Sequence, residues 1–210
     1  MSKDEVYEAL RVQIVTNAVR PGDILNEKDL MARFGIGRSP LREVLFRLQE
    51  ENLLKPLPRL GYMATTLDLS EARQLVELRR ELEGFAGQLA AERITEEQID
   101  ELRAIIRQAE EQTTEDHEVI SLSEYFDTRF HSLLYEAAGN RKLTRILQDL
   151  HTVMLRIWFH VGLHPVRFSR QAESLHAVLK ALQAKDSRKA RTSMESHVDL
   201  YAATLKERIL

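Results

Sequence analysis

Cysteine is absent from this 210-residue chain. Without thiols the protein forms no disulfide and offers no thiolate to a metal, so a metal site would have to consist of imidazole and carboxylate ligands. Long apolar runs are absent as well: no segment approaches the length of a membrane span, and the polar N-terminus lacks the apolar core of a signal peptide. We therefore expect a cytoplasmic protein without a membrane partner.

The chain also lacks a strong excess of either charge. Its formal net charge is −3, which excludes a protein that coats nucleic acid through overall basicity. Proline is scarce in the second part of the sequence, where only Pro165 occurs between Asp68 and Leu210, and this favours long helices there. The length and the hydrophobic content of 43% permit two modest domains, each with its own core.

A helix, a tight turn and a second helix are predicted after Asn26. This residue is a suitable N-cap for a helix that begins at Glu27 and ends at Gly35. Ser39 is a suitable N-cap for the next helix, and Pro40 favours its first turn. Apolar residues at helical spacing predict one buried face on each helix: Leu30, Met31 and Phe34 on the first, and Leu41, Val44, Leu45 and Leu48 on the second.

Basic residues gather around the start of the second helix. Arg33, Arg38, Arg42 and Arg47 lie in a stretch whose only acidic residue is Glu43. A helix N-terminus attracts anions, and guanidinium groups bind phosphates and guanine edges, so this arrangement suits DNA. Two short strands are then predicted, Leu53–Leu57 and Gly61–Thr65, around a turn that contains Arg59. Such a hairpin beside two helices would form a wing.

Residues 6–66 resemble the winged helix-turn-helix of GntR-type transcriptional regulators. The resemblance rests on Pro21-Gly22, on Gly61 in the wing, and on the stretch Gly35-Ile36-Gly37-Arg38-Ser39-Pro40-Leu41-Arg42-Glu43-Val44-Leu45. It implies double-stranded DNA as a partner and a wing whose Gly61 approaches the minor groove. The other DNA contacts that it implies come from Arg33, Arg38, Ser39 and Arg42. Gly37 departs from the family pattern, in which serine is usual, and Leu60 stands at a wing position that is often small or basic.

From Asp68 onward the sequence has helical periodicity almost throughout. We expect six helices, at about 69–92, 96–112, 117–138, 141–162, 167–184 and 187–209. Thr95 with Gln98 resembles a capping box, Gly139-Asn140 separates two helices, and His164-Pro165 breaks another. The predicted fold class is therefore mainly α, with an N-terminal winged helix-turn-helix at residues 1–66 and an all-α bundle of six or more helices at residues 67–210.

Four side chains are candidates for a metal site. Asp127 and His131 are four residues apart, so a helix places both on one face, where they can chelate a metal. His176 and His197 lie among apolar neighbours on the last two predicted helices, and a helical bundle can bring all four together. One carboxylate and three neutral imidazoles suit Zn, Ni, Co, Fe or Mn. Core histidines satisfied by hydrogen bonds are the alternative interpretation of the same pattern.

Residues 68–210 resemble the all-helical FCD domain of the FadR-like subgroup of GntR regulators. The resemblance rests on Leu78–Glu83 with Ala90–Arg93, on Asp127–His131 with Ala137–Asn140, and on His176 and His197. It implies a divalent metal, Zn or Ni before Mn, Fe or Co, held by Asp127, His131, His176 and His197. It also implies a small organic acid as effector, a contact from Arg79 to the effector carboxylate, and a homodimer on a palindromic operator.

Arg79 has a second interpretation, because Glu83 stands at i+4 and can form a salt bridge with it. For the whole chain we expect a metabolite-responsive transcriptional regulator, acting as a repressor, and no enzyme. One alternative is a DNA-binding regulator whose bundle only dimerises and holds no metal. The other is a metal-dependent hydrolytic enzyme, against which the sequence offers neither a nucleophile elbow nor a phosphate-binding glycine loop.

Overall fold

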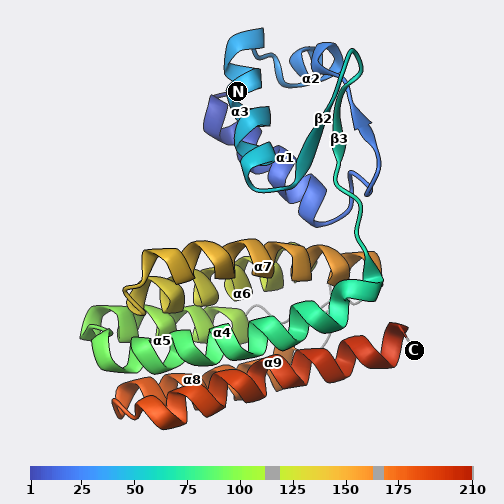
Figure 1. Cartoon of the computed structure of the whole chain (residues 1–210). Helices are drawn as coiled ribbons and strands as arrows, with labels where there is room; N and C mark the ends of the chain where they lie inside the picture. The colour runs from blue at the N-terminus through green and yellow to red at the C-terminus, as the bar shows by residue number, and fades with distance from the viewer. Residues whose placement is uncertain (112–118, 163–167, 210) are drawn as a thin grey trace. The chain divides into compact units, whose positions relative to one another are not determined.

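The computed structural model describes residues 1–111, 119–162 and 168–209, which are mainly helical with one small sheet (Figure 1). The chain divides into two compact units. The first comprises Met1–Leu69 with Thr152–His160, and the second comprises Ser70–His151 with Val161–Leu210. The predicted fold class is confirmed. Among the helices in these ranges, none is both long and apolar enough to span a membrane.

The first unit contains three helices and three short strands in its described part. In chain order they are α1 (Lys3–Val15), β1 (Ile24–Leu25), α2 (Glu27–Phe34), α3 (Arg38–Glu50), β2 (Leu54–Leu57) and β3 (Gly61–Ala64). Helix α1 begins with a capping box, in which Ser2 and Glu5 each accept a hydrogen bond from the backbone N–H of the other. Its buried face, which includes Leu10 and Ile14, packs into one core with α2, α3 and the sheet.

The turn between α2 and α3 follows the predicted chemistry except at the start of α3. Asn26 caps α2 by accepting a hydrogen bond from the backbone N–H of Lys28, and Gly35 ends it in the left-handed conformation with φ +61°. Helix α3, however, has Gly37 as its N-cap and no side-chain cap, so the assignment of Ser39 as the cap was wrong. The extended backbone of Gly37 starts the helix two residues earlier, which places Ser39 and Pro40 in the first turn, where proline is tolerated.

The three strands form an antiparallel sheet in the order β1-β3-β2. The predicted hairpin is present, and Leu57 pairs with Gly61 at its closed end. Strand β1, which pairs Leu25 with Tyr62, was not predicted because two residues carry no detectable alternation. Gly61 has φ +118°, and a Cβ at this position would overlap the carbonyl oxygen of Leu25. The sheet itself therefore requires glycine here.

The second unit contains each of the six predicted helices. They follow a short 3-10 turn (Leu69–Glu71) as α4 (Ala72–Arg93), α5 (Glu96–Glu111), α6 (Val119–Ala137), α7 (Arg141–His160), α8 (Phe168–Gln183) and α9 (Ser187–Ile209). Helix α7 is shared, because its last nine residues belong to the first unit. The capping box of Thr95 and Gln98 is formed at the start of α5. The predicted break at His164-Pro165 lies outside the described residues.

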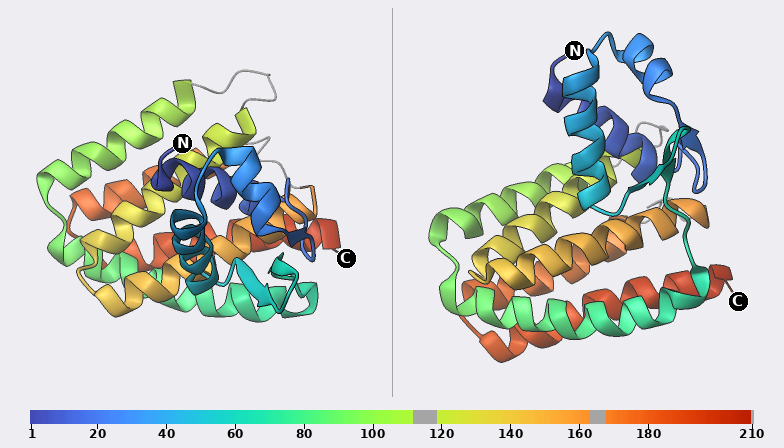
Figure 2. Two further views of the ribbon diagram at one scale, coloured as in Figure 1. Left: turned by 90° about the horizontal axis from the view of Figure 1, so that it is seen from above. Right: turned by 45° about the horizontal axis from the view of Figure 1, so that its top comes forward.

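Helices α4 and α9 lie side by side and antiparallel along the bundle, as all views show (Figures 1 and 2). Two glycines of α4 face α9. A Cβ on Gly87 would lie 3.0 Å from the carbonyl oxygen of Ala190 and 2.8 Å from Cγ of Met194. A Cβ on Gly84 would meet only side-chain atoms of Glu195 and Arg191. A side chain at position 87 would therefore overlap backbone atoms of α9, which cannot easily move. A side chain at position 84 would meet only side chains of α9, which can move.

This difference predicts opposite effects of two alanine substitutions. Gly87→Ala should lower the free energy of unfolding by about 1–2 kcal/mol, because overpacking against fixed backbone outweighs the gain in helix propensity. Gly84→Ala should leave it unchanged or raise it by up to about 1 kcal/mol, because glycine inside a helix is unfavourable. Urea denaturation of both variants checks this. Equal destabilisation by the two substitutions would contradict the assigned role of the Ala190 carbonyl.

Candidate functional site

The first candidate surface is the solvent-facing side of α2 and α3. The side chains of Arg33, Arg38, Ser39 and Arg42 are all exposed, while the opposite side of α3 is buried in the core. The Arg42 side chain is 61% exposed, and its Nε lies 3.2 Å from Oε2 of Glu27. A surface ion pair of this kind contributes little and is easily exchanged. The guanidinium groups of Arg38 and Arg42 near the start of α3, and that of Arg33 in the last turn of α2, are therefore exposed to an anionic partner.

Arg47, also on α3, is used differently. Its guanidinium lies 3.5 Å from the centre of the Tyr7 ring, and its Nη1 lies 3.6 Å from Oδ1 of Asp4. The Tyr7 hydroxyl in turn donates to Glu51. This group attaches α1 to α3 and belongs to the internal packing of the unit. The wing contributes Arg59, which has φ +68° at the hairpin turn, followed by the exposed Leu60.

The second candidate site is a buried polar cluster in the bundle. Its side chains come from helices of the second unit: Arg79 and Glu83 from α4, Asp127, His131 and Tyr135 from α6, His151 from α7, and His197 and the half-buried Tyr201 from α9. Asp127 is 7% exposed, His131 1%, His151 5% and His197 0%. Burial of so many ionisable groups is costly unless they compensate one another or bind an ion. The cluster is therefore a candidate binding site.

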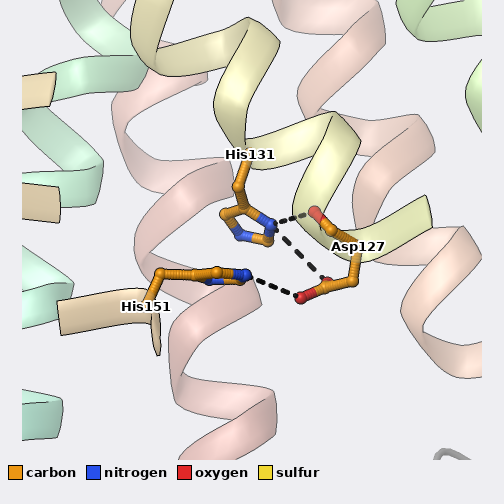
Figure 3. A group of neighbouring side chains, drawn as sticks. All are labelled: Asp127, His131 and His151. Carbon is orange, nitrogen blue, oxygen red and sulfur yellow. Dashed lines mark hydrogen bonds and ion pairs between the residues drawn. The ribbon is translucent and has the colours of Figure 1, made fainter. Parts of the chain in front are cut away.

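Asp127 faces both His131 and His151 (Figure 3). Its Oδ1 is 3.6 Å from Nδ1 of His131 and accepts a hydrogen bond of 2.8 Å from the hydroxyl of Tyr201. Its Oδ2 is 3.5 Å from Nε2 of His151. Asp127, His131 and His151 each place one ligand-type atom within 4.8 Å of the others. The tyrosine bond orients the carboxylate, and the spacing is that of groups that could share one cation.

His197 approaches the same group from α9. The centre of its ring is 5.3 Å from that of His131, and its Nδ1 lies 2.7 Å from Oγ of Ser174 on α8. Burial, together with the nearby charge of His131, lowers the pKa of His197 to about 3. The ring is therefore neutral at physiological pH, and its Nε2 makes no hydrogen bond to any residue that the structure describes. A neutral, oriented imidazole with an unpaired buried nitrogen fits a metal ligand well.

Three of the four proposed metal ligands are thus together, and the fourth is not. His176 is an exposed residue of α8, and its Nε2 lies 2.9 Å from Oε1 of Glu110 on the surface. The expectation that His176 joins the cluster must be corrected, because Leu175 and Leu179 define the buried face of α8 and His176 is rotated away from it. His151 takes its place. Asp127, His131 and His151 lie close enough together to hold a divalent metal ion, and the His197 ring lies beside that of His131.

The alternative interpretation of Arg79 is realised in the structure. Its Nη2 lies 2.5 Å and its Nε 2.7 Å from Oε1 of Glu83, and both residues are buried. Burial acts to raise the pKa of Glu83, but the charges of Arg79 and His131 outweigh it and hold that pKa well below its usual range. Burial alone would lower the pKa of His131, yet Asp127 and Glu83 raise it. Sequence reasoning assigned Glu83 no role beyond this pair.

A winged helix-turn-helix unit followed by a helical unit is typical of DNA-binding transcriptional regulators. Comparison with known families agrees. Residues 2–63 match the family described as bacterial regulatory proteins, gntR family, and residues 74–200 match the FCD domain. The chain belongs to the gntR family of regulators and carries an FCD domain, as the resemblance implied.

Individual relatives are also transcriptional regulators. The chain is 30% identical to the uncharacterized HTH-type regulator YdhC of Bacillus subtilis over 165 residues, which cover 76% of this chain and 72% of YdhC. It is 26% identical to the HTH-type transcriptional repressor RspR of Escherichia coli over 97% of this chain and 88% of RspR. The solved structure of E. coli McbR/YncC has the same fold, with a TM-score of 0.83 at 22% identity over 99% of this chain and 98% of that one. The chain is a regulator and not an enzyme.

Proposed function

We propose that this regulator binds a divalent metal in the buried cluster and a small organic acid beside it, and that the acid changes its affinity for a palindromic operator. The proposal rests on one observation above all: buried carboxylate and imidazole groups from three helices converge, and the Nε2 atoms of His131 and His197 make no hydrogen bond. Zn or Ni is the preferred metal for such a set, with Mn, Fe and Co as further options. When bound, the metal would supply a Lewis acid that attracts a carboxylate.

The DNA-contacting residues of the proposal are Arg33, Arg38, Ser39, Arg42 and Gly61, in a domain of residues 1–66. Exposure of the first four on one side of the helix-turn-helix supports this assignment. One reading helix contacts few base pairs, so we propose a homodimer whose two-fold axis matches that of the operator. Repression is the proposed output, because the relative RspR is named a transcriptional repressor.

The effector-binding part of the proposal assigns residues 67–210 to effector binding and dimerisation. Arg79 remains the proposed contact for an effector carboxylate, because a guanidinium pairs with a carboxylate through two parallel hydrogen bonds. In the structure this guanidinium is bound to Glu83. An effector must therefore share Arg79 with Glu83 or displace it, which restricts the site to acids small enough to enter a cluster already filled by protein groups.

Fluorescence anisotropy of the metal-loaded protein tests the proposed switch. The probe is a labelled operator selected from random DNA by the protein itself, and a panel of small carboxylic acids is titrated into the complex. We expect one class of acid to change the operator affinity by about 5- to 150-fold, the usual range of allosteric coupling. Removal of the metal with a chelator should abolish this change. An operator affinity that no acid alters, with the metal demonstrably bound, would reject the switch and leave DNA binding intact.

A further inference from the structure

Glu83 is a second carboxylate at the cluster, and among the described residues only one of its two oxygens accepts a hydrogen bond. The side chain is fully buried on α4. Its Oε1 receives both contacts from Arg79, at 2.5 and 2.7 Å. Its Oε2 is buried as well and makes no hydrogen bond. An unsatisfied carboxylate oxygen in the interior costs considerable free energy, so a charged group beside it would be needed to compensate it.

The atom that faces this oxygen is also unsatisfied. Nε2 of His131 lies 3.5 Å from Oε2 of Glu83, and within the described parts of the chain it makes no hydrogen bond. Nδ1 of the same ring lies 2.9 Å from the backbone carbonyl oxygen of Asp127. A carbonyl oxygen only accepts, so Nδ1 carries a hydrogen, and in the neutral ring Nε2 presents a lone pair. Two lone pairs then face each other, an arrangement that is stable only with a proton or a metal ion between them.

We propose that Oε2 of Glu83 is an additional ligand of the metal held by Asp127 and the three histidines, with Arg79 fixing its other oxygen. This inference rests on the metal binding proposed above. Carboxylate ligands are commonly oriented by a hydrogen bond to their second oxygen, and Arg79 provides that bond. Both unpaired atoms, Glu83 Oε2 and His131 Nε2, become satisfied by the same ion.

The additional ligand changes the chemistry of the site in two ways. Glu83 lowers the positive charge of the interior site, because a divalent cation with Arg79 and Asp127 alone would carry a formal charge of +2 and Glu83 reduces it to +1. A fifth protein ligand also disfavours the four-coordinate geometry typical of structural zinc and favours metals that accept five or six ligands, such as Ni, Co, Mn or Fe. Glu83 then helps to determine which metal binds, and Arg79 holds the Glu83 carboxylate in the orientation that this requires.

The cobalt-substituted protein tests this inference, since Co²⁺ reports its coordination number in the visible spectrum. We compare wild type, Glu83→Gln and Glu81→Gln by competition with a chromophoric chelator and by absorption. Glu81 is on the same helix with a side chain 61% exposed, so its substitution is a matched control. Glu83→Gln should lower the Co²⁺ affinity at least about 10-fold and intensify the visible bands as the coordination number falls. Glu81→Gln should change neither.

Three outcomes would overturn the inference. Unchanged affinity and spectrum in Glu83→Gln would show that Glu83 only neutralises Arg79. A wild-type protein that takes up no metal would reject the proposed metal site and this ligand with it. A four-coordinate ion in the wild-type protein, measured by X-ray absorption, would reject Glu83 alone, and this measurement needs no variant. Should Glu83→Gln fail to fold, Glu83→Asp keeps the charge but shortens the reach, and we expect it to lower the affinity in the same direction.

Discussion

Replacing Arg42 with alanine is expected to weaken operator binding by about 10- to 100-fold, the loss typical of an arginine that contacts a base edge or a phosphate. The side chain is 61% exposed on the outward side of α3, so its removal should not disturb the core. Anisotropy titrations with the selected operator measure the effect, and thermal melting verifies that the unit remains folded. If the lost contact is to a phosphate, the salt dependence of binding should also become shallower by about one counterion.

Glu27→Gln is the control with the opposite sign. Nε of Arg42 lies 3.2 Å from Oε2 of Glu27, so in the free protein the acid competes with DNA for the guanidinium. Removing that charge should leave operator affinity equal or make it tighter. Weaker operator binding by Glu27→Gln, or unchanged operator binding by Arg42→Ala, would show that this side of α3 does not contact DNA. The comparison also separates loss of a DNA contact from a general loss of stability.

The two sites differ in how far the sequence alone predicts them. The helix-turn-helix is a local structure, so Asn26 and Gly35, each a cap of known preference, fix its geometry within a few residues. Even there the cap of α3 was misplaced, because the extended backbone of Gly37 starts the helix without a side-chain bond. Strand β1 depends entirely on its pairing with β3, and two residues carry no pattern of their own.

The buried cluster depends on the rotational phase of each helix, in which one residue corresponds to about 100°. On α8 the buried residues Ala172, Leu175, Leu179 and Leu182 leave His176 one position outside the stripe. On α7 His151 follows Leu147 by four residues and precedes Met154 by three, which places it within the buried stripe. This phase was present in the sequence and would have identified His151. The contact between Glu83 and His131 could not be predicted in this way, because only the packing of the bundle brings α4 and α6 together.

The largest effect that we expect in the bundle is loss of metal binding in His151→Ala. This substitution removes a proposed ligand whose Nε2 lies 3.5 Å from Oδ2 of Asp127. It should lower the metal affinity by about 100-fold or more, because even the loss of a residue that only hydrogen-bonds to a ligand costs about 10- to 100-fold. His176→Ala should leave the affinity unchanged, because this residue only forms an exposed pair with Glu110. Competition with a chromophoric chelator measures both values for Zn²⁺ and Ni²⁺.

Thermal melting with and without metal gives an independent readout of the same contrast. A metal at about 1,000 times its dissociation constant stabilises the folded state by about 4 kcal/mol, which corresponds to roughly 8–16 °C for a protein of this size. Wild type and His176→Ala should both lose this increment on addition of a chelator. His151→Ala should keep only about a third of this increment, because a 100-fold lower affinity leaves the metal at about 10 times its dissociation constant, which stabilises by about 1.4 kcal/mol. The opposite result would be metal-dependent melting that is complete in His151→Ala and absent in His176→Ala. It would show that His176, and not His151, is the ligand, as expected from the sequence. Helix α8 would then have to rotate by about one residue from the orientation that buries Leu175.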